Sequence, residues 1–378
     1  MGSAQTKEML LSATDNNRFV LDAKFYVSYH LLMMSIFTFV LLSTLGLQAY
    51  SAPSGKICDG NRVVNYHPTG FVFPSGWSTD QPAAAIYPGQ DCKWTVLVPQ
   101  GKYAKVEAKG YIGNGRNAIE AFYGFDYTDA SQEENLVPYY LPAPKFALRL
   151  FADVNSTDTY SFKITWFDLP KITGNLFIGN NDVTVKNASE FPSATVVSAD
   201  GAVSVVVIPN TPVDFKKMRS TLIFDGPSFS SNFMGSIFPI AMSGRQLWGD
   251  SKNITIINLN PTSGPQDLIV LQDYNNTKSF NNYAGLECTN GNCNMHAFAP
   301  GRVASAFVSA SNAKDTITGV DMTVDSTFCI YNGTITPKNL LANYTSDTLP
   351  SALPLSFPGF IKQYVFSIHN AAINITRT

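Results

Sequence analysis

The five cysteines are the residues whose chemistry is easiest to anticipate, because thiols form disulfides or bind metals. A bridge between Cys58 and Cys92 would close one loop. Cys288 and Cys293 flank the turn-forming tetrad Thr-Asn-Gly-Asn, which favours a small disulfide loop. Cys329 is then left over, or it pairs with Cys288 or Cys293, since connectivity cannot be deduced from sequence. Neither the cysteines nor the histidines show the spacing of metal ligands, so we predict no metal site and no cofactor.

Catalytic motifs are absent from the sequence. The chain has no His-Glu-x-x-His zinc helix, no Gly-x-Ser-x-Gly nucleophile elbow and no Gly-rich phosphate loop. Glu133 and Glu134 are adjacent, so on a strand their carboxylates point to opposite faces and cannot act as an acid and base pair. We therefore expect no enzyme activity and no catalytic residues.

Two tryptophans are candidates for ligand binding, because an exposed indole can stack on a sugar ring. Trp77 ends a Phe-Pro-Ser-Gly-Trp loop, and Trp248 lies between a glycine-arginine pair and a Gly-Asp turn. Either ring could instead fill the open end of a β-sandwich.

Seven asparagines stand in Asn-x-Ser/Thr sequons, which predict N-glycosylation on exposed turns of an exported protein. They are Asn155, Asn187, Asn253, Asn275, Asn332, Asn343 and Asn374.

All cysteines and sequons follow an uncharged apolar run from Leu31 to Leu47, after which come the small residues Ala49, Ser51 and Ala52. This pattern predicts that residues 1–52 are a polar extension and a secretory signal peptide. A run of about 17 residues also reaches the lower limit of a membrane-spanning helix, so a retained signal anchor is the alternative. Contact with a membrane is expected only in that case.

The composition narrows the class of protein. A net charge of -2, from 26 basic and 28 acidic residues, argues against binding of nucleic acid, which requires a basic face. The densest basic cluster, Lys216 to Arg219, is expected to form a solvated turn. The 26 Phe and 17 Tyr of this 378-residue chain favour strands over helices, and its length favours two or three domains.

Strands must position these residues, and one of them is clear. Cys92, Trp94, Val96 and Val98 fall on one side of a strict alternation, which predicts a strand with one buried face. Trp94 therefore belongs in a core. A Pro-Gln-Gly sequence after Val98 ends the strand.

A pattern with the length of one sandwich domain, about 100 residues, recurs three times. An apolar strand ends in an aromatic residue and a glycine turn at 122–124, 224–226 and 331–333. Such turns occur in any β-rich chain, and it is the shared spacing that favours a repeat. We predict an all-β protein of three tandem antiparallel β-sandwiches of jelly-roll type, over residues 53–170, 171–276 and 277–378.

Several motifs follow one another between residues 58 and 168. They are Cys58, Tyr87-Pro88, Cys92-Lys93-Trp94, Phe73-Pro74-Ser75-Gly76-Trp77, Lys102-Tyr103-Ala104-Lys105 and Pro138-Tyr139-Tyr140-Leu141-Pro142-Ala143-Pro144-Lys145-Phe146. This segment resembles a CUB domain, and more closely the divergent nematode CUB-like family. The second and third repeats resemble it less.

The resemblance implies a two-sheet sandwich with a Cys58–Cys92 disulfide. Calcium-binding CUB domains use three carboxylates, of which only Asp153 has a counterpart here, and one carboxylate cannot supply the oxygen ligands that calcium needs. The resemblance also implies an extracellular protein, since nematode CUB-like proteins are associated with innate immune and stress responses.

We therefore predict a secreted glycoprotein for extracellular recognition or adhesion, with an unknown extracellular protein or glycan as its partner. A lectin-like immune or stress-response effector is the working hypothesis. The alternative is a structural component of a matrix or membrane raft without a ligand pocket. A lectin should gather aromatic, Asn and Asp side chains in a cleft, whereas a matrix protein should have broad flat surfaces.

Overall fold

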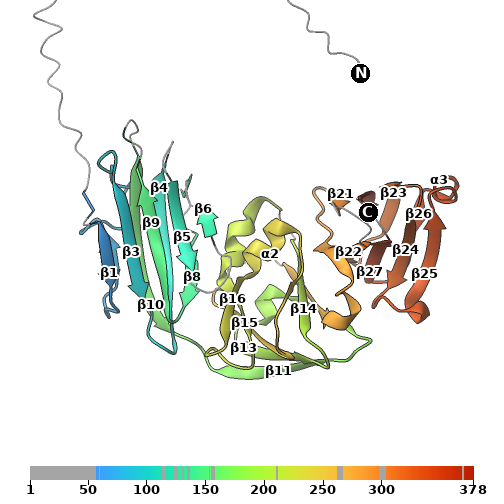
Figure 1. Cartoon of the computed structure of the whole chain (residues 1–378), viewed down its shortest axis with the longest axis horizontal. Helices are drawn as coiled ribbons and strands as arrows, with labels where there is room; N and C mark the ends of the chain where they lie inside the picture. Colours follow the sequence, from blue (N-terminus) through green and yellow to red (C-terminus); the bar gives the residue numbers. More distant parts are fainter. Residues whose placement is uncertain are drawn as a thin grey trace, which may run out of the picture. The chain divides into compact units, whose positions relative to one another are not determined.

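The computed structural model describes residues 57–58, 60–112, 116–121, 127–129, 132–133, 137–152, 154, 158–209, 212–261, 267–297, 304–367 and 370–378 (Figure 1). Residues 54–378 form one compact unit. The predicted signal segment, the first aromatic-glycine turn, Asp153 and Asn155 lie outside the described residues. Among those that are described, no helix has the length and hydrophobicity needed to span a membrane.

The first sandwich is built from two sheets (Figure 1). One has the order β1-β3-β9-β5-β6, with bounds Asn61–Val64, Asp91–Leu97, Lys145–Phe151, Arg116–Ala121 and Tyr127–Asp129. The other has the order β2-β10-β4-β7, with bounds Phe71–Phe73, Thr159–Asp168, Lys102–Tyr111 and Gln132–Glu133, and β8 (Tyr139–Pro142) also pairs with β4.

The second sandwich repeats this arrangement. Its first sheet has the order β11-β13-β18-β15-β16, with bounds Ile172–Ile178, Ala194–Ala199, Asn253–Asn258, Thr221–Asp225 and Asn232–Ser236. Its second sheet has the order β12-β19-β14-β17, with bounds Val183–Asn187, Leu268–Asp273, Val203–Ile208 and Leu247–Trp248.

The third sandwich does so again. One sheet has the order β20-β22-β27-β24-β25, with bounds Phe280–Gly285, Ala304–Ala310, Ile361–Phe366, Thr327–Asn332 and Leu340–Thr345. The other has the order β21-β28-β23-β26, with bounds Asn292–Ala297, Ala371–Arg377, Asp315–Met322 and Leu355–Ser356. The described helices are short: η1 (Ala188–Glu190), η2 (Pro212–Ser220), α2 (Ile237–Ser243), η3 (Tyr274–Asn276), η4 (Pro337–Asn339) and α3 (Leu349–Ala352).

The three sandwiches share one topology, which confirms the predicted tandem all-β fold. Each has a parallel pair at one sheet edge, namely β1 with β3, β11 with β13 and β20 with β22. The strands β15 and β24 hold equivalent places and lead into the second and third aromatic-glycine turns. Both glycines adopt positive φ, 137° at Gly226 and 80° at Gly333, a conformation that side chains disfavour.

Alternation along β3 is as predicted. Cys92, Trp94 and Val96 are buried, whereas Lys93 and Thr95 are partly exposed. The Trp94 ring lies 4.7 Å from the ring of Phe73 and 5.0 Å from that of Phe162, so it is central to the first core.

Both predicted disulfides are present, Cys58–Cys92 and Cys288–Cys293, and Cys329 is a free, partly buried thiol. The second sandwich contains no cysteine. It is therefore held by packing and hydrogen bonds without a covalent cross-link.

The second sandwich contacts the first through aromatic residues of β8. Tyr140 is buried in one cluster with Leu222 and Phe224 of β15. The guanidinium of Arg219 lies 3.8 Å from the centre of the Tyr139 ring. The predicted solvated turn over residues 216–219 is therefore wrong for Met218 and Arg219, which are 1% and 4% exposed. Met218 packs into the core of its own sandwich, and Arg219 lies between Tyr139 of the first sandwich and Phe238 of α2, contacts that local sequence cannot reveal.

The second sandwich also packs against the third, through one face of its second sheet. Val203, Val205 and Val207 of β14 point into the core of the second sandwich. The outward side chains Val206, Ile208, Val270 and Gln272 form what we call the docked face. Its three apolar members share a cluster with residues of β20, β22 and β27 in the third sandwich, including Tyr283, Val308 and Val365.

Two details fit this contact closely. A Cβ atom added at Gly285 would lie 2.1 Å from the carbonyl oxygen of Val207, so the backbones of the two sandwiches meet there. The Tyr283 hydroxyl accepts a hydrogen bond from Gln272 and donates one of 2.8 Å to Gln363. Burial raises the pKa of Tyr283, which keeps the phenol neutral and able to donate.

Candidate functional site

Trp77, one of the two predicted ligand-binding residues, is not presented to a ligand. It is 7% exposed, and its indole N–H donates a 2.9 Å hydrogen bond to the Pro82 carbonyl. The loop folds back on itself, with the backbone N–H of Trp77 bonded to the Pro74 carbonyl. A ligand role for Trp77 is therefore contradicted, because its own loop has buried the ring.

Trp248 is 46% exposed on the edge strand β17. Its ring stacks on Tyr274, with centroids 4.8 Å apart and planes 10° from parallel. One face of each ring is thus taken by the other, and the pair forms an exposed aromatic platform rather than a cleft. It lies beside the sequon residue Asn275.

A polar hollow lies instead on the third sandwich, but among the described residues its lining lacks the Phe, Tyr or Trp side chains expected of a lectin cleft. His296 of β21 and Asp321 of β23 are both paired in register with Ala372 of β28, which lies between them. Residues directly opposite in neighbouring strands project to the same side of a sheet, so the small Ala372 is flanked by two long polar side chains. The hollow of about 340 Å³ that results is lined by His296, Asp321, Met322, Thr323, Asn370, Ala371 and Ala372. We call it the trough.

The polar groups of the trough face solvent. His296, Asp321, Thr323 and Asn370 are all exposed. In the part of the chain that the structure describes, the side chains of His296 and Asp321 form no hydrogen bond or ion pair. The lining of the trough therefore combines a carboxylate acceptor, an imidazole, a hydroxyl and an amide with the apolar residues Met322, Ala371 and Ala372.

Sequence reasoning missed this site. His296 and Asp321 are joined only through the register of β28, and the histidines were considered only as metal ligands. A usable signal was the alternation Asn292, Asn294 and His296, which marks the outward side of β21 as polar throughout. No local pattern indicates that Asp321 would stand two strands away.

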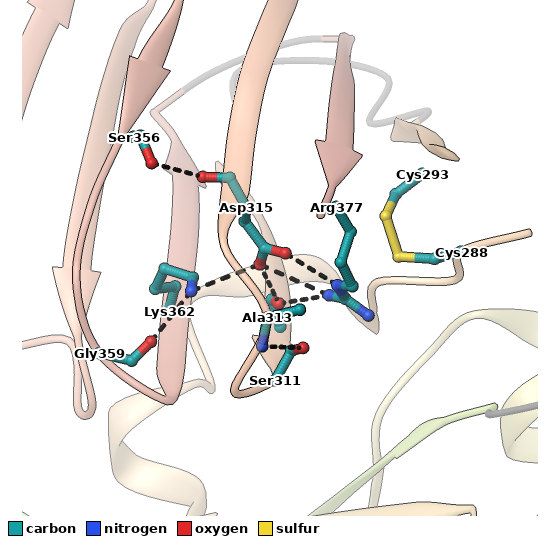
Figure 2. Close-up of polar contacts among 10 residues, drawn as sticks. Cys288, Cys293, Ser311, Ala313, Asp315, Ser356, Gly359, Lys362 and Arg377 are labelled. Carbon is teal, nitrogen blue, oxygen red and sulfur yellow. Dashed lines mark hydrogen bonds and ion pairs between the residues drawn. A yellow bond between two sulfur atoms is a disulfide. The ribbon is translucent and has the colours of Figure 1, made fainter. Parts of the chain in front are cut away.

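A second group of charged residues lies at the other end of β23 (Figure 2). Asp315 is fully buried and accepts hydrogen bonds of 2.8 Å from Arg377 Nε and 2.7 Å from Ser309 Oγ. Figure 2 shows its carboxylate between Arg377 and Lys362, whose Nζ lies 3.5 Å away. Burial acts to raise the pKa of Asp315, but the hydrogen bonds from Arg377 and Ser309 outweigh it and hold that pKa below its ordinary value. This closed network has a structural role.

The described sequons differ in exposure. Asn275, Asn332, Asn343 and Asn374 are exposed, and Asn187 and Asn253 are partly buried. Asn374 lies two residues from Ala372 on the same side of β28, so a glycan there would begin beside the trough. Among the residues described, no three His, Cys, Asp or Glu side chains lie close enough to hold a metal ion.

Three family models match successive parts of the chain. A CUB-like domain matches residues 48–170, and domains of unknown function match residues 178–259 (DUF7592) and 275–378 (DUF7591). The chain thus contains a CUB-like domain, a module of extracellular recognition and protein interaction, and such domains and disulfides are typical of extracellular proteins. No curated protein matches the chain.

Solved structures give distant similarities. The CUB1-EGF-CUB2 domains of human MASP-1/3 are 12% identical, with 52% of this chain and 97% of that chain covered and a TM-score of 0.20. The same domains of rat MASP-1 are 8% identical, with 56% of this chain and 99% of that chain covered and a TM-score of 0.21. Tripeptidyl peptidase 2 is 8% identical, with 83% of this chain and 24% of that chain covered and a TM-score of 0.24.

Proposed function

We propose that this protein is a secreted, N-glycosylated recognition protein that binds carbohydrate in the trough. The observation that carries the proposal is the convergence of His296, Asp321, Thr323 and Asn370 around one hollow of about 340 Å³. Sugar hydroxyls both donate and accept hydrogen bonds, and these four side chains offer both functions. The apolar lining at Ala372 suits the C–H face of a sugar ring.

The sequence motifs support a finer assignment. We assign the chain to the divergent nematode CUB-like family and place its recognition in innate immune or stress responses. The N-terminal apolar run and the sequons support export and glycosylation. Binding without turnover is the proposed activity, because the sequence carries none of the catalytic motifs considered above.

The test is a glycan-array and whole-bacterium binding assay on the chain from Ala52 onward. Wild-type protein should show saturable binding, and Asp321→Ala and His296→Ala should each weaken it about tenfold or more, as loss of a hydrogen bond to a charged or exposed polar partner implies. Thr318→Ala is the matched control, since Thr318 is exposed on the same strand but does not line the trough.

Three other results would contradict the proposal. Loss of binding in Trp248→Ala but not in the trough variants would move the site to the aromatic platform. Absence of binding by folded wild-type protein would end the carbohydrate proposal. Self-association of that non-binding protein, measured by sedimentation, would favour the matrix or raft alternative.

A further inference from the structure

We infer that the trough prefers sugars that carry a positively charged free amine, such as glucosamine units, over N-acetylated or acidic sugars. The inference rests on the proposed carbohydrate binding and names the ligand class.

The first argument is the charge of the lining. Asp321 is the one Asp, Glu, Lys or Arg residue among those that line the trough. No cation in the described part of the chain pairs with it. A ligand ammonium would supply the missing partner, and a charge-assisted hydrogen bond is roughly twice as strong as a neutral one.

The second argument is the position of the surrounding charges. Arg377 and Lys362 are bound to Asp315, which is six residues from Asp321 along β23, or about 20 Å at the rise of a strand. That distance exceeds the Debye length of about 8 Å at physiological salt, so these cations do not neutralise the trough. Among the described residues, the charge that lines the trough therefore favours an amine over a carboxylate sugar.

The third argument separates a sugar from a lysine side chain. His296 and Asp321 stand on either side of β28, about 10 Å apart at twice the spacing of neighbouring strands, which leaves room for one ring between them. A lysine would satisfy Asp321 alone. A sugar ring with its amine at Asp321 also brings hydroxyls to His296, Thr323 and Asn370.

The neighbouring sequon affects how the inference is tested. Asn374 is about 7 Å from Ala372 along β28, so its glycan would compete for the same space. Enzymatic removal of the glycan would convert Asn374 to aspartate and add a charge beside the trough. The Asn374→Gln background avoids both effects and is used for every variant below.

The experiment is calorimetric titration, at neutral pH, with two tetrasaccharides that differ only in N-acetylation. The glucosamine tetramer should bind about tenfold or more tightly than the N-acetylglucosamine tetramer, as one charge-assisted hydrogen bond implies. Asp321→Asn, which keeps the shape of an exposed side chain, should abolish this preference while the neutral tetramer still binds. Asp250→Asn, an exposed carboxylate of the second sandwich, makes the same change in net charge and should leave the preference intact.

The outcomes separate the two proposals. Equal affinity for both tetramers, with binding still lost in His296→Ala, would overturn the amine preference and leave carbohydrate binding standing. An equal loss of preference in Asp250→Asn would overturn it as well, since net charge would then be the cause. Binding of neither tetramer, nor of any arrayed glycan, by the folded wild-type protein would overturn both.

Discussion

The sheets β12-β19-β14-β17 and β21-β28-β23-β26 hold the same place in successive sandwiches, but the outward face of the first is buried and that of the second is exposed. On the second sandwich, Val206, Ile208 and Val270 are buried against the third. On the third, His296, Asp321 and Asn374 are exposed. The backbone topology does not decide whether a sheet face is covered. The side chains that the alternation places outward decide it.

Magnitudes explain the difference. Full burial of one Val or Ile side chain is worth about 1.5–3 kcal/mol, so three of them on the docked face supply several kcal/mol toward holding the second and third sandwiches together. Burial of the equivalent polar face would cost energy for each group left without a hydrogen-bond partner. We call the outward face of β21-β28-β23-β26 the open face. It remains exposed and can bind a ligand because its side chains are polar, whereas the apolar docked face is covered by the third sandwich.

The largest effect should come from giving the docked face the charge of the open one. Val206→Asp would bury a carboxylate without a partner and should lower the free energy of unfolding by about 5 kcal/mol, the value of a pKa shift of several units. Thr318→Asp places a carboxylate on the open face and should change the free energy of unfolding by about 0.5 kcal/mol or less. Urea denaturation measures both. Similar losses in the two variants would mean that the docked face is not buried in solution.

The next effect concerns the first residues of the equivalent strands, Val203 in β14 and Asp315 in β23. Asp315→Asn leaves the buried Lys362 without its anion and should cost about 4 kcal/mol at neutral pH. Because the pKa of Asp315 in the folded protein lies below its ordinary 3.8, its contribution is complete above that value and is lost as the pH falls through the folded-state pKa.

The gap in unfolding free energy between wild type and Asp315→Asn should therefore narrow below about pH 4. Asp168→Asn, which removes an exposed carboxylate paired with Lys102, is the control and should change little. A gap that stays constant from neutral to acid pH would show that the Asp315 carboxylate is not the stabilising species.

A smaller effect should separate two strand glycines. Gly285→Ala puts a Cβ against the Val207 carbonyl and should destabilise the protein by about 2 kcal/mol, the usual cost of overpacking. At Gly319, on the open sheet, the nearest atom to an added Cβ is the movable Asn374 side-chain nitrogen at 3.1 Å, so Gly319→Ala should be close to neutral. Thermal unfolding of both variants tests this, and equal midpoints would argue against close contact between the sandwiches.

The sequence predicted what depends on local pattern. The alternation through Cys92 and Trp94 and the recurrent sandwich follow from spacing along the chain, and both are present. The Cys58–Cys92 disulfide was implied by the CUB-like resemblance, and the Cys288–Cys293 loop was one of the pairings left open. The burial of Trp77 and Arg219 could not be decided from the sequence, because it depends on a folded loop and on contacts with β8 and α2. The trough was missed because strand register is a tertiary property. One signal was overlooked: β14 reads Val-Ser-Val-Val-Val-Ile, and an apolar run with few polar breaks indicates burial on both faces.

The docked face has a consequence for synthesis of the protein. A chain that emerges from its N-terminus completes the second sandwich before β20 and β22 exist, so Val206, Ile208 and Val270 remain uncovered in the meantime. At about 5–20 residues per second, the roughly 100 residues that follow take about 5–20 s to appear. Throughout that interval the nascent chain exposes the apolar docked face on a sandwich that no disulfide restrains. We expect chaperone binding to the nascent chain to be strongest during that interval.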